Sequence, residues 1–141
     1  MWSHRHFGVW DGATAAVCPG VFGPFGHPYY NSVIATFCHQ ISHNEAPRID
    51  VDGDLKLIYV GELIVQILNF IRNNNQAEHL VIPHTSEKKV SEILTILQGF
   101  NINYLQNGSI PFLNNYFELN LFNTFRCYMD IKKHFPIKFT K

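Results

Sequence analysis

The chain has 141 residues and a mass of 16.3 kDa, enough for one modest hydrophobic core but short for a two-domain nucleotide-dependent enzyme. Eleven basic and eleven acidic side chains give a formal net charge of zero, so neither nucleic acid nor an anionic membrane would attract it electrostatically. With 46% hydrophobic and 16% charged residues, the composition predicts a folded domain. A chain with this apolar content and no net charge is also expected to bury surface against another copy or a missing partner segment.

The cysteines and the apolar runs indicate the cellular compartment. Cys18, Cys38 and Cys127 are widely spaced and include no C-x-x-C motif, so we expect neither a disulfide framework nor a zinc site. No apolar run has the length of a signal peptide or of the roughly 18 residues of a membrane span. We therefore expect a soluble, unexported protein of the reducing cytoplasm.

Apolar periodicity predicts an α/β chain with a few short strands and about four helices. Residues 13–18 form a small apolar run typical of a buried strand, whereas residues 19–30 carry three glycines and three prolines, which excludes regular structure there. Helices are expected at 32–43, 62–73, from Thr85 or Ser86 to Gly99, and at 115–130, and further strands at 48–51, 55–60 and 79–83.

Local signals define the expected connections between these elements. Asn31 or Ser32 can cap the first helix, and Gly99 should end the third. Asp52-Gly53-Asp54 has the chemistry of a tight turn, so the strands on either side of it are expected to pair as a hairpin. The alternation of strands with helices predicts parallel pairing with right-handed crossovers, in a narrow sheet with exposed edges.

A glycine pattern in the loop imitates a dinucleotide-binding motif. Gly20, Gly23 and Gly26 match G-x-x-G-x-x-G, but such a loop needs a helix to begin inside it so that backbone N–H groups meet the pyrophosphate. Pro24 and Pro28 prevent a helix there. We therefore interpret the glycines as part of an ordinary loop.

Two side-chain pairs deserve a chemical interpretation. Tyr128 and Lys132 match Y-x-x-x-K, the spacing of a tyrosine acid activated by an ammonium group, but a partly buried tyrosine beside a solvated lysine is the simpler interpretation. We therefore predict no catalytic residue. His39 and His43 could share a metal ion from one helix face, yet no third ligand is suitably spaced, so we predict no metal site.

The loop and its surroundings resemble the second half of an extended short-chain dehydrogenase/reductase of the NAD-dependent epimerase/dehydratase family. Pro19, Val21, Phe22, Gly23 and Pro24 match the loop motif of that family, and Ile58, Tyr59 and Val60 match a later strand that precedes a helix. Residues 30–39, with 117–118 and 121–125, look like the capsular-polysaccharide branch of sugar-nucleotide reductases. The resemblance covers about residues 17–136.

The sequence also departs from the family pattern. Gly20 stands where many relatives have a substrate-binding asparagine, and Gly61-Glu62 replaces an acidic pair. Residues 1–12 match nothing in the family, and the nucleotide-binding strand, its glycine loop and the catalytic Tyr/Lys helix would lie upstream of Val17. The resemblance thus implies a partial Rossmann-like fold in which residues 13–141 are the C-terminal substrate-binding part.

The resemblance also implies ligands and site residues. The complete enzyme would use NAD or NADP and a nucleotide sugar of the UDP-hexose type. Backbone groups of Pro19, Gly20 and Val21 would line the cofactor pocket, and the substrate contacts would be Phe22, Tyr30, Asn31, Ser32 and Arg126. Each of these residues also has a purely structural interpretation. Residues 19–21 could form an ordinary strand-to-loop turn, Asn31 or Ser32 could cap the helix, and Arg126 could simply be solvated.

Two functions follow from these expectations. The first is a fragment of an NAD(P)-dependent sugar-nucleotide epimerase, dehydratase or reductase for surface polysaccharide biosynthesis, inactive alone and without tight cofactor binding. The second is a non-catalytic module that binds a nucleotide sugar, or another protein through an exposed sheet edge.

Overall fold

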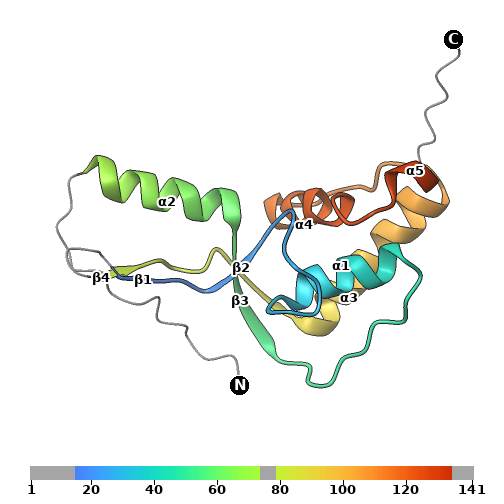
Figure 1. The fold of residues 1–141 in the computed structure, drawn as a ribbon, viewed down its shortest axis with the longest axis horizontal. Coiled ribbons are helices and arrows are strands. Elements are labelled where there is room, and N and C mark those ends of the chain that lie inside the picture. Colours follow the sequence, from blue (N-terminus) through green and yellow to red (C-terminus); the bar gives the residue numbers. More distant parts are fainter. Residues whose placement is uncertain (1–14, 74–78, 135–141) are drawn as a thin grey trace, which may run out of the picture.

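The computed structural model describes residues 15–73 and 79–134. Its elements are β1 (Ala15–Val17), β2 (Gly20–Phe22), α1 (Val33–Ser42), β3 (Asp54–Tyr59), α2 (Val60–Arg72), β4 (His79–Val81), β5 (Ser86–Lys89), α3 (Val90–Phe100), a π-helical segment (Asn101–Gln106), α4 (Tyr116–Arg126) and α5 (Ile131–His134). Figure 1 shows an elongated molecule, with α2, β1 and β4 at one end and α1, α3, α4 and α5 at the other. Strands β2 and β3 lie between the two ends.

The strands form two small sheets. β1 pairs in parallel with β4, and β2, β3 and β5 form a second sheet in that order. Within the second sheet β2 runs parallel to β3, whereas β3 and β5 are antiparallel. The expected α/β class with parallel pairing is confirmed. The antiparallel partner of β3 is β5 and not the strand predicted at residues 48–51.

Helices α1, α3 and α4 enclose one hydrophobic core. Ser32 caps α1 as expected, because its Oγ accepts a hydrogen bond from the Ala35 N–H at 3.2 Å. Asn115 caps α4 in the same way, accepting from the Glu118 N–H at 2.9 Å. The buried cluster contains Phe22, Ile34, Phe37, Cys38, Ile41, Leu57, Val90, Ile93, Leu97, Phe100, Phe117, Leu121, Phe122 and Phe125. Each large apolar side chain buried in this way stabilises the fold by about 1.5–3 kcal/mol.

The expectation that residues 19–30 contain no regular structure is wrong for Gly20–Phe22, which form β2. Gly20 permits the close approach to β3, since a Cβ there would lie 3.2 Å from the Lys56 carbonyl oxygen. Phe22 reaches the core and is only 4% exposed. Pairing and burial therefore impose a strand that the local composition does not favour, while residues 23–31 form the expected loop.

The hairpin expected around Asp52-Gly53-Asp54 is also wrong, because residues 48–51 form no strand. The Asp52 carboxylate instead accepts hydrogen bonds from the Ser91 N–H at 2.8 Å and from the Ser91 hydroxyl at 2.7 Å. These bonds hold the pKa of Asp52 below its usual value. The turn residues thus anchor the chain to the start of α3 and leave β3 free to pair with β2 and β5.

The boundaries predicted for the third and fourth helices need correction. Residues 86–89 form β5, and α3 begins at Val90, where a Glu92 carboxylate oxygen accepts from the Lys89 N–H at 3.2 Å. Gly99 does not end α3, which continues into the π-helical segment. The last predicted helix, 115–130, ends early at Arg126 as α4, and the short α5 begins at Ile131, after the predicted end. Its first part was correctly placed because the buried aromatic side chains keep helical spacing.

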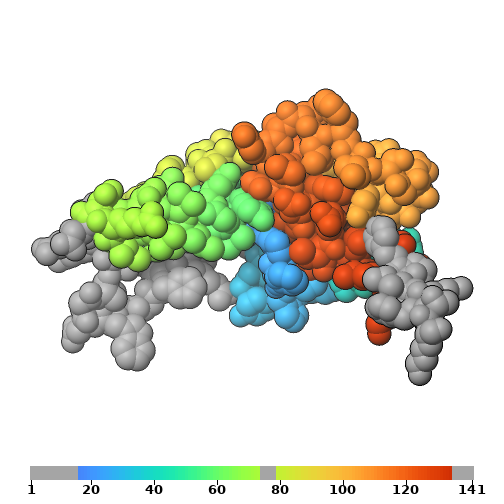
Figure 2. Space-filling model, turned by 90° about the horizontal axis from the view of Figure 1, so that it is seen from above, coloured from blue at the N-terminus to red at the C-terminus, as the bar shows by residue number. Residues whose placement is uncertain are grey.

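Helix α2 differs from the other long helices because none of its side chains is buried. Leu63, Ile67 and Phe70 are half-buried, whereas Ile64, Val65, Leu68 and Ile71 are between 43% and 63% exposed. Figure 2 shows the helix lying uncovered at the surface. Within residues 15–73 and 79–134, no helix has both the length and the apolar composition that a membrane span requires.

The assigned core predicts different effects for two phenylalanine substitutions. Phe125 is fully buried and Phe112 is 85% exposed. Phe125→Ala should lower the free energy of unfolding by about 3–5 kcal/mol, because it leaves a cavity, whereas Phe112→Ala should change it by less than about 0.5 kcal/mol. Urea denaturation followed by circular dichroism measures both. Equal effects would contradict this core.

Candidate functional site

The loop at residues 23–31, between β2 and α1, lies beside most of the site residues predicted from sequence. Three hydrogen bonds hold it in place. The Tyr128 hydroxyl donates to the Gly26 carbonyl oxygen at 2.7 Å, the Tyr29 N–H donates to Thr36 Oγ1 at 2.9 Å, and the Tyr29 hydroxyl donates to the Glu45 carboxylate. Phe25 and Tyr29 have φ angles of 64° and 61°, a region that non-glycine residues rarely adopt. The loop is therefore a fixed, strained element.

An open hollow of about 650 Å³ lies between this loop and the C-terminal helices. Its walls are formed by Pro24, Phe25, Tyr104, Asn123, Arg126, Cys127, Met129 and Ile131. The Arg126 guanidinium lies 5.8 Å from the centre of the Phe122 ring and forms no ion pair within the described residues. Apolar walls with one unpaired guanidinium suit a ligand that has an apolar body and an anionic group.

The predicted cofactor-binding residues lie at the beginning of β2. Gly20 and Val21 are exposed, and Pro19 is half-buried. β2 is an edge strand, because its sheet has the order β2-β3-β5. One side of its backbone therefore pairs with no strand in the part of the chain that the structure describes. That side can offer N–H and C=O groups to a ligand.

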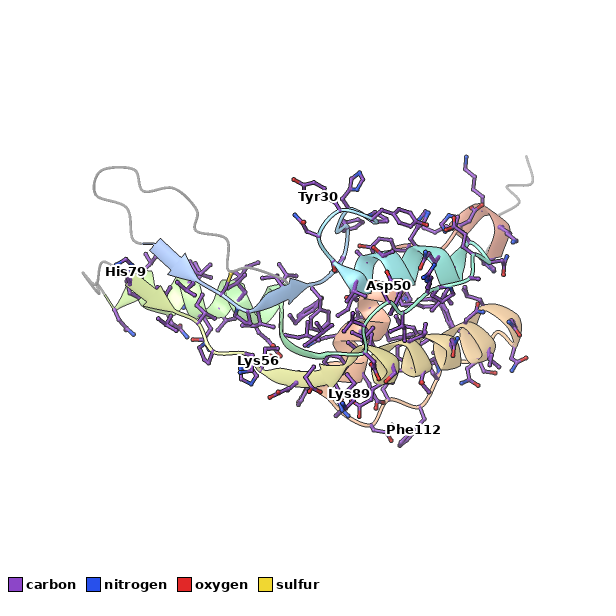
Figure 3. The ribbon with its side chains drawn as sticks, turned by 90° about the horizontal axis from the view of Figure 1, so that it is seen from below. Tyr30, Asp50, Lys56, His79, Lys89 and Phe112 are labelled. Carbon is purple, nitrogen blue, oxygen red and sulfur yellow. The ribbon has the colours of Figure 1, made fainter. Side chains whose placement is uncertain are left out.

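The predicted substrate-binding residues are not all gathered at one place. Tyr30 and Asn31 are exposed at the end of the loop, and Figure 3 shows Tyr30 at the edge of the molecule. The Ser32 hydroxyl is engaged as the cap of α1. Phe22 packs against the rings of Tyr59 and Phe117 in the core, which disfavours ligand contact through its side chain.

The hollow brings Arg126 together with residues 24–25, whereas Tyr30, Asn31 and Ser32 are not among its lining residues. Sequence reasoning missed Phe25, Tyr104 and Met129. The position of Phe25 inside the Gly/Pro-rich loop is a signal that could have pointed to an exposed aromatic side chain. Tyr104 belongs to the π-helical segment, for which the sequence carries no signal.

The structure favours the non-catalytic interpretation of Tyr128 and Lys132. α4 ends at Arg126 and α5 begins at Ile131, so the two residues do not share a helix. Burial, with smaller contributions from the nearby cysteines, raises the pKa of Tyr128 to about 12. A tyrosine that acts as a proton donor and acceptor near neutral pH needs the opposite shift.

The glycines of the loop serve close packing. A Cβ at Gly26 would lie 3.1 Å from the Tyr128 hydroxyl oxygen, and one at Gly23 would lie 2.5 Å from Val60 Cγ1. No helix begins between these glycines, since α1 starts at Val33. The described residues thus do not form a pyrophosphate-binding turn, which agrees with the interpretation of the sequence.

The histidine pair lies at the C-terminal end of α1. The rings of His39 and His43 stack with their centres 4.1 Å apart, and His43 Nδ1 lies 2.9 Å from the His39 carbonyl oxygen. Among the described residues, no group of three or more His, Cys, Asp or Glu side chains is placed to hold a metal ion. Cys38 is fully buried, and this burial raises the pKa of its thiol far above the usual value.

Comparison with known proteins identifies the kind of protein to which this fold belongs. No family model matches the chain. The UDP-2-acetamido-2,6-beta-L-arabino-hexul-4-ose reductase of Pseudomonas aeruginosa is 36% identical over 47 residues, which are 33% of this chain and 13% of that protein. The crystal structure of the capsular polysaccharide assembling protein CapF from Staphylococcus aureus matches with a TM-score of 0.72 and 30% identity. The chain matches the C-terminal part of an extended short-chain dehydrogenase/reductase.

The match is extensive for this chain and partial for its relatives. It covers 84% of this chain and 34% of the CapF chain. An NAD-dependent NDP-hexosamine 5,6-dehydratase of tunicamycin biosynthesis shares the fold, with a TM-score of 0.61 and 14% identity, over 80% of this chain and 44% of that one. The chain therefore spans about a third of the length of CapF, and the partial Rossmann-like fold expected from sequence is confirmed.

The raised pKa of Tyr128 predicts how stability changes at alkaline pH. Its neutral hydroxyl stabilises the fold fully below the ordinary tyrosine pKa of about 10, and this contribution is lost as the pH rises toward about 12. Tyr128→Phe should lower the free energy of unfolding at neutral pH by about 0.5–1.5 kcal/mol and flatten its alkaline decrease. Denaturation across this pH range tests this, with the exposed Tyr116→Phe as control. An alkaline decrease that is unchanged in Tyr128→Phe would refute the assignment.

Proposed function

We propose that the chain is the substrate-binding part of an NAD(P)-dependent sugar-nucleotide epimerase, dehydratase or reductase of surface polysaccharide biosynthesis. The observation that carries this proposal is the match to CapF at 30% identity over 84% of the chain. The names of the relatives support the chemistry, since one is a UDP-sugar reductase and another an NAD-dependent dehydratase of NDP-hexosamines. The three cysteines are unpaired, which suits a reducing cytoplasm.

The geometry supports a nucleotide sugar at the loop between β2 and α1. The first turn of α1 has free N–H groups beside Asn31, and such groups favour anions. Arg126 adds a guanidinium that can hold a phosphate in two places. In the complete enzyme, NAD or NADP would adjoin residues 19–21 and accept or donate the hydride.

The described residues do not by themselves fit a dinucleotide. No helix begins in the glycine pattern, and the hydroxyl of Tyr128 is held by the Gly26 carbonyl. We therefore assign no reaction step to this chain. A non-catalytic module remains the second candidate function, favoured by the uncovered apolar side chains of α2, because an exposed apolar surface of this kind marks contact with another macromolecule.

The nucleotide-sugar site predicts weak binding that depends on two residues. Because part of the ligand stays exposed, its affinity should be no better than about millimolar, roughly −4 kcal/mol. Ligand-observed NMR with UDP-N-acetylhexosamine and with NADH measures it. Asn31→Ala and Arg126→Ala should each weaken the UDP-sugar signal, whereas Arg72→Ala, at the far end of α2, should not. A binding signal for NADH but not for the UDP-sugar, or a UDP-sugar signal that neither substitution weakens, would favour the non-catalytic module.

The same assignment predicts that the purified chain has no dehydrogenase activity. The tyrosine of the Y-x-x-x-K pattern lies in the turn between α4 and α5, whereas the lysine lies on α5, and the tyrosine has a raised pKa. Absorbance at 340 nm would report oxidation of NADH or NADPH in the presence of UDP-hexoses. Steady turnover that Tyr128→Phe abolishes would overturn the proposal of a chain that is inactive alone.

A further inference from the structure

The connection between the π-helical segment and α4 begins with an asparagine that is followed by a glycine. Asn107 is the one asparagine of the sequence that precedes a glycine. The side-chain amide of an asparagine can be attacked by the backbone nitrogen of the next residue, and glycine hinders this attack least because it has no side chain. Asparagine belongs to the thermolabile residues. The pair Asn107-Gly108 therefore has the chemistry of a spontaneous modification site.

The peptide bond between Asn107 and Gly108 is free to turn. Neither the Asn107 carbonyl oxygen nor the Gly108 N–H forms a hydrogen bond within residues 15–73 and 79–134. The neighbouring peptides are held, since the Asn107 N–H donates to the Ile102 carbonyl oxygen at 3.1 Å and the Ser109 N–H donates to the Asn103 carbonyl oxygen at 2.8 Å. With ψ of Asn107 at −10°, the Gly108 nitrogen must turn toward the side chain before it attacks, and this rotation breaks no hydrogen bond.

The surroundings of the pair also permit the attack. Both residues are exposed, and a Cβ at Gly108 would meet no heavy atom of a more distant residue within 4 Å. Asn44 provides a contrast within the same chain. It is exposed too and has a φ angle of 59°, but the N–H of the following Glu45 donates to the Gln40 carbonyl oxygen at 2.7 Å. The nitrogen that would attack Asn44 is therefore engaged.

We propose that Asn107 is a site of spontaneous deamidation. The Gly108 nitrogen attacks the side-chain carbonyl carbon of Asn107, and the new C–N bond closes a succinimide ring. The side-chain NH₂ group takes the proton of the attacking nitrogen and leaves as ammonia. Water then opens the ring at either of its carbonyls, which gives isoaspartate or aspartate. The new carboxylate is ionised at neutral pH, because its ordinary pKa is about 3.9, so the chain of zero net charge gains one negative charge.

The modified residue lies at the end of the segment that carries Tyr104 to the hollow. Asn107 is the C-cap of the π-helical segment, whose last turn contains no basic side chain, so a new carboxylate meets unneutralised helix carbonyls. Isoaspartate also adds a methylene group to the main chain, which moves Ser109 away from the Asn103 carbonyl oxygen. Tyr104 packs against Phe122 with ring centres 5.1 Å apart and lines the hollow. Deamidation therefore loosens this wall, whichever ligand the hollow takes.

Incubation of the full chain in warm, mildly alkaline buffer tests the proposal. Peptide mapping by mass spectrometry should find deamidation at Asn107, while Asn44 remains an amide. Isoelectric focusing should show a species with one more negative charge. Asn107→Gln keeps the amide but lengthens the side chain, which disfavours the five-membered ring, and should slow the appearance of this species roughly tenfold or more.

A synthetic peptide of residues 103–112 separates the chemistry of the pair from the effect of the fold. The folded chain should deamidate at Asn107 within roughly tenfold of the rate of the peptide, because the exposed peptide bond can turn without local unfolding. Conversion of the peptide while the folded chain stays unmodified would overturn the proposal. Faster conversion of Asn44 than of Asn107, or a product with aspartate but no isoaspartate, would do so as well.

Thermal denaturation of incubated samples tests the consequence for the hollow. The midpoint of unfolding should fall in the incubated native chain and stay unchanged in incubated Asn107→Gln, which cannot readily form the carboxylate. Circular dichroism before incubation verifies that both proteins fold alike. Equal midpoints of the two incubated proteins, at a measured conversion of Asn107, would refute the loosened wall.

Discussion

The ring of Phe22 joins the parts of the chain on which the candidate site depends. It packs between Tyr59 at the end of β3 and Phe117 in the first turn of α4, with ring centres 5.5 Å apart in both pairs. This contact fixes where β2 ends and therefore where the loop at residues 23–31 begins. It also fixes α4, which carries Arg126 to the hollow. Together with the hydrogen bond from the Tyr128 hydroxyl to the Gly26 carbonyl oxygen, this contact sets the position of the loop relative to α4.

The sequence predicts those elements whose own residues determine them. α1 and α4 were placed correctly because apolar spacing and a capping side chain agree within each segment. β2 and β5 could not be found in this way. Gly20–Phe22 lies within a Gly/Pro-rich stretch and Ser86–Lys89 is polar, and both become strands through pairing with β3. Asp52 illustrates the same limit. A turn-forming pattern became an anchor for Ser91, a residue far along the chain.

Only some residues of the candidate site could likewise be predicted from the sequence. Arg126 was chosen for its chemistry, and the structure places it at a hollow beside the loop. Asn31 was chosen because it precedes a helix, and it lies outside that hollow. The walls formed by Phe25 and Tyr104 depend on a positive φ angle and on a π-helical segment. The sequence predicts neither of these backbone conformations, although the position of Phe25 in the Gly/Pro-rich loop could have pointed to an exposed aromatic side chain.

The hydrogen bond from the Tyr128 hydroxyl to the Gly26 carbonyl joins residues 102 positions apart. Together with the contact between Phe22 and Phe117, it gives the fold contacts between nearly opposite ends of the described chain. Closing so long a loop costs entropy before any contact compensates for it. During synthesis on the ribosome, β2 and its loop therefore cannot adopt their native packing until α4 has emerged. The core forms only after α4 has emerged, and until then the apolar faces of α1 and α3 are available to chaperones.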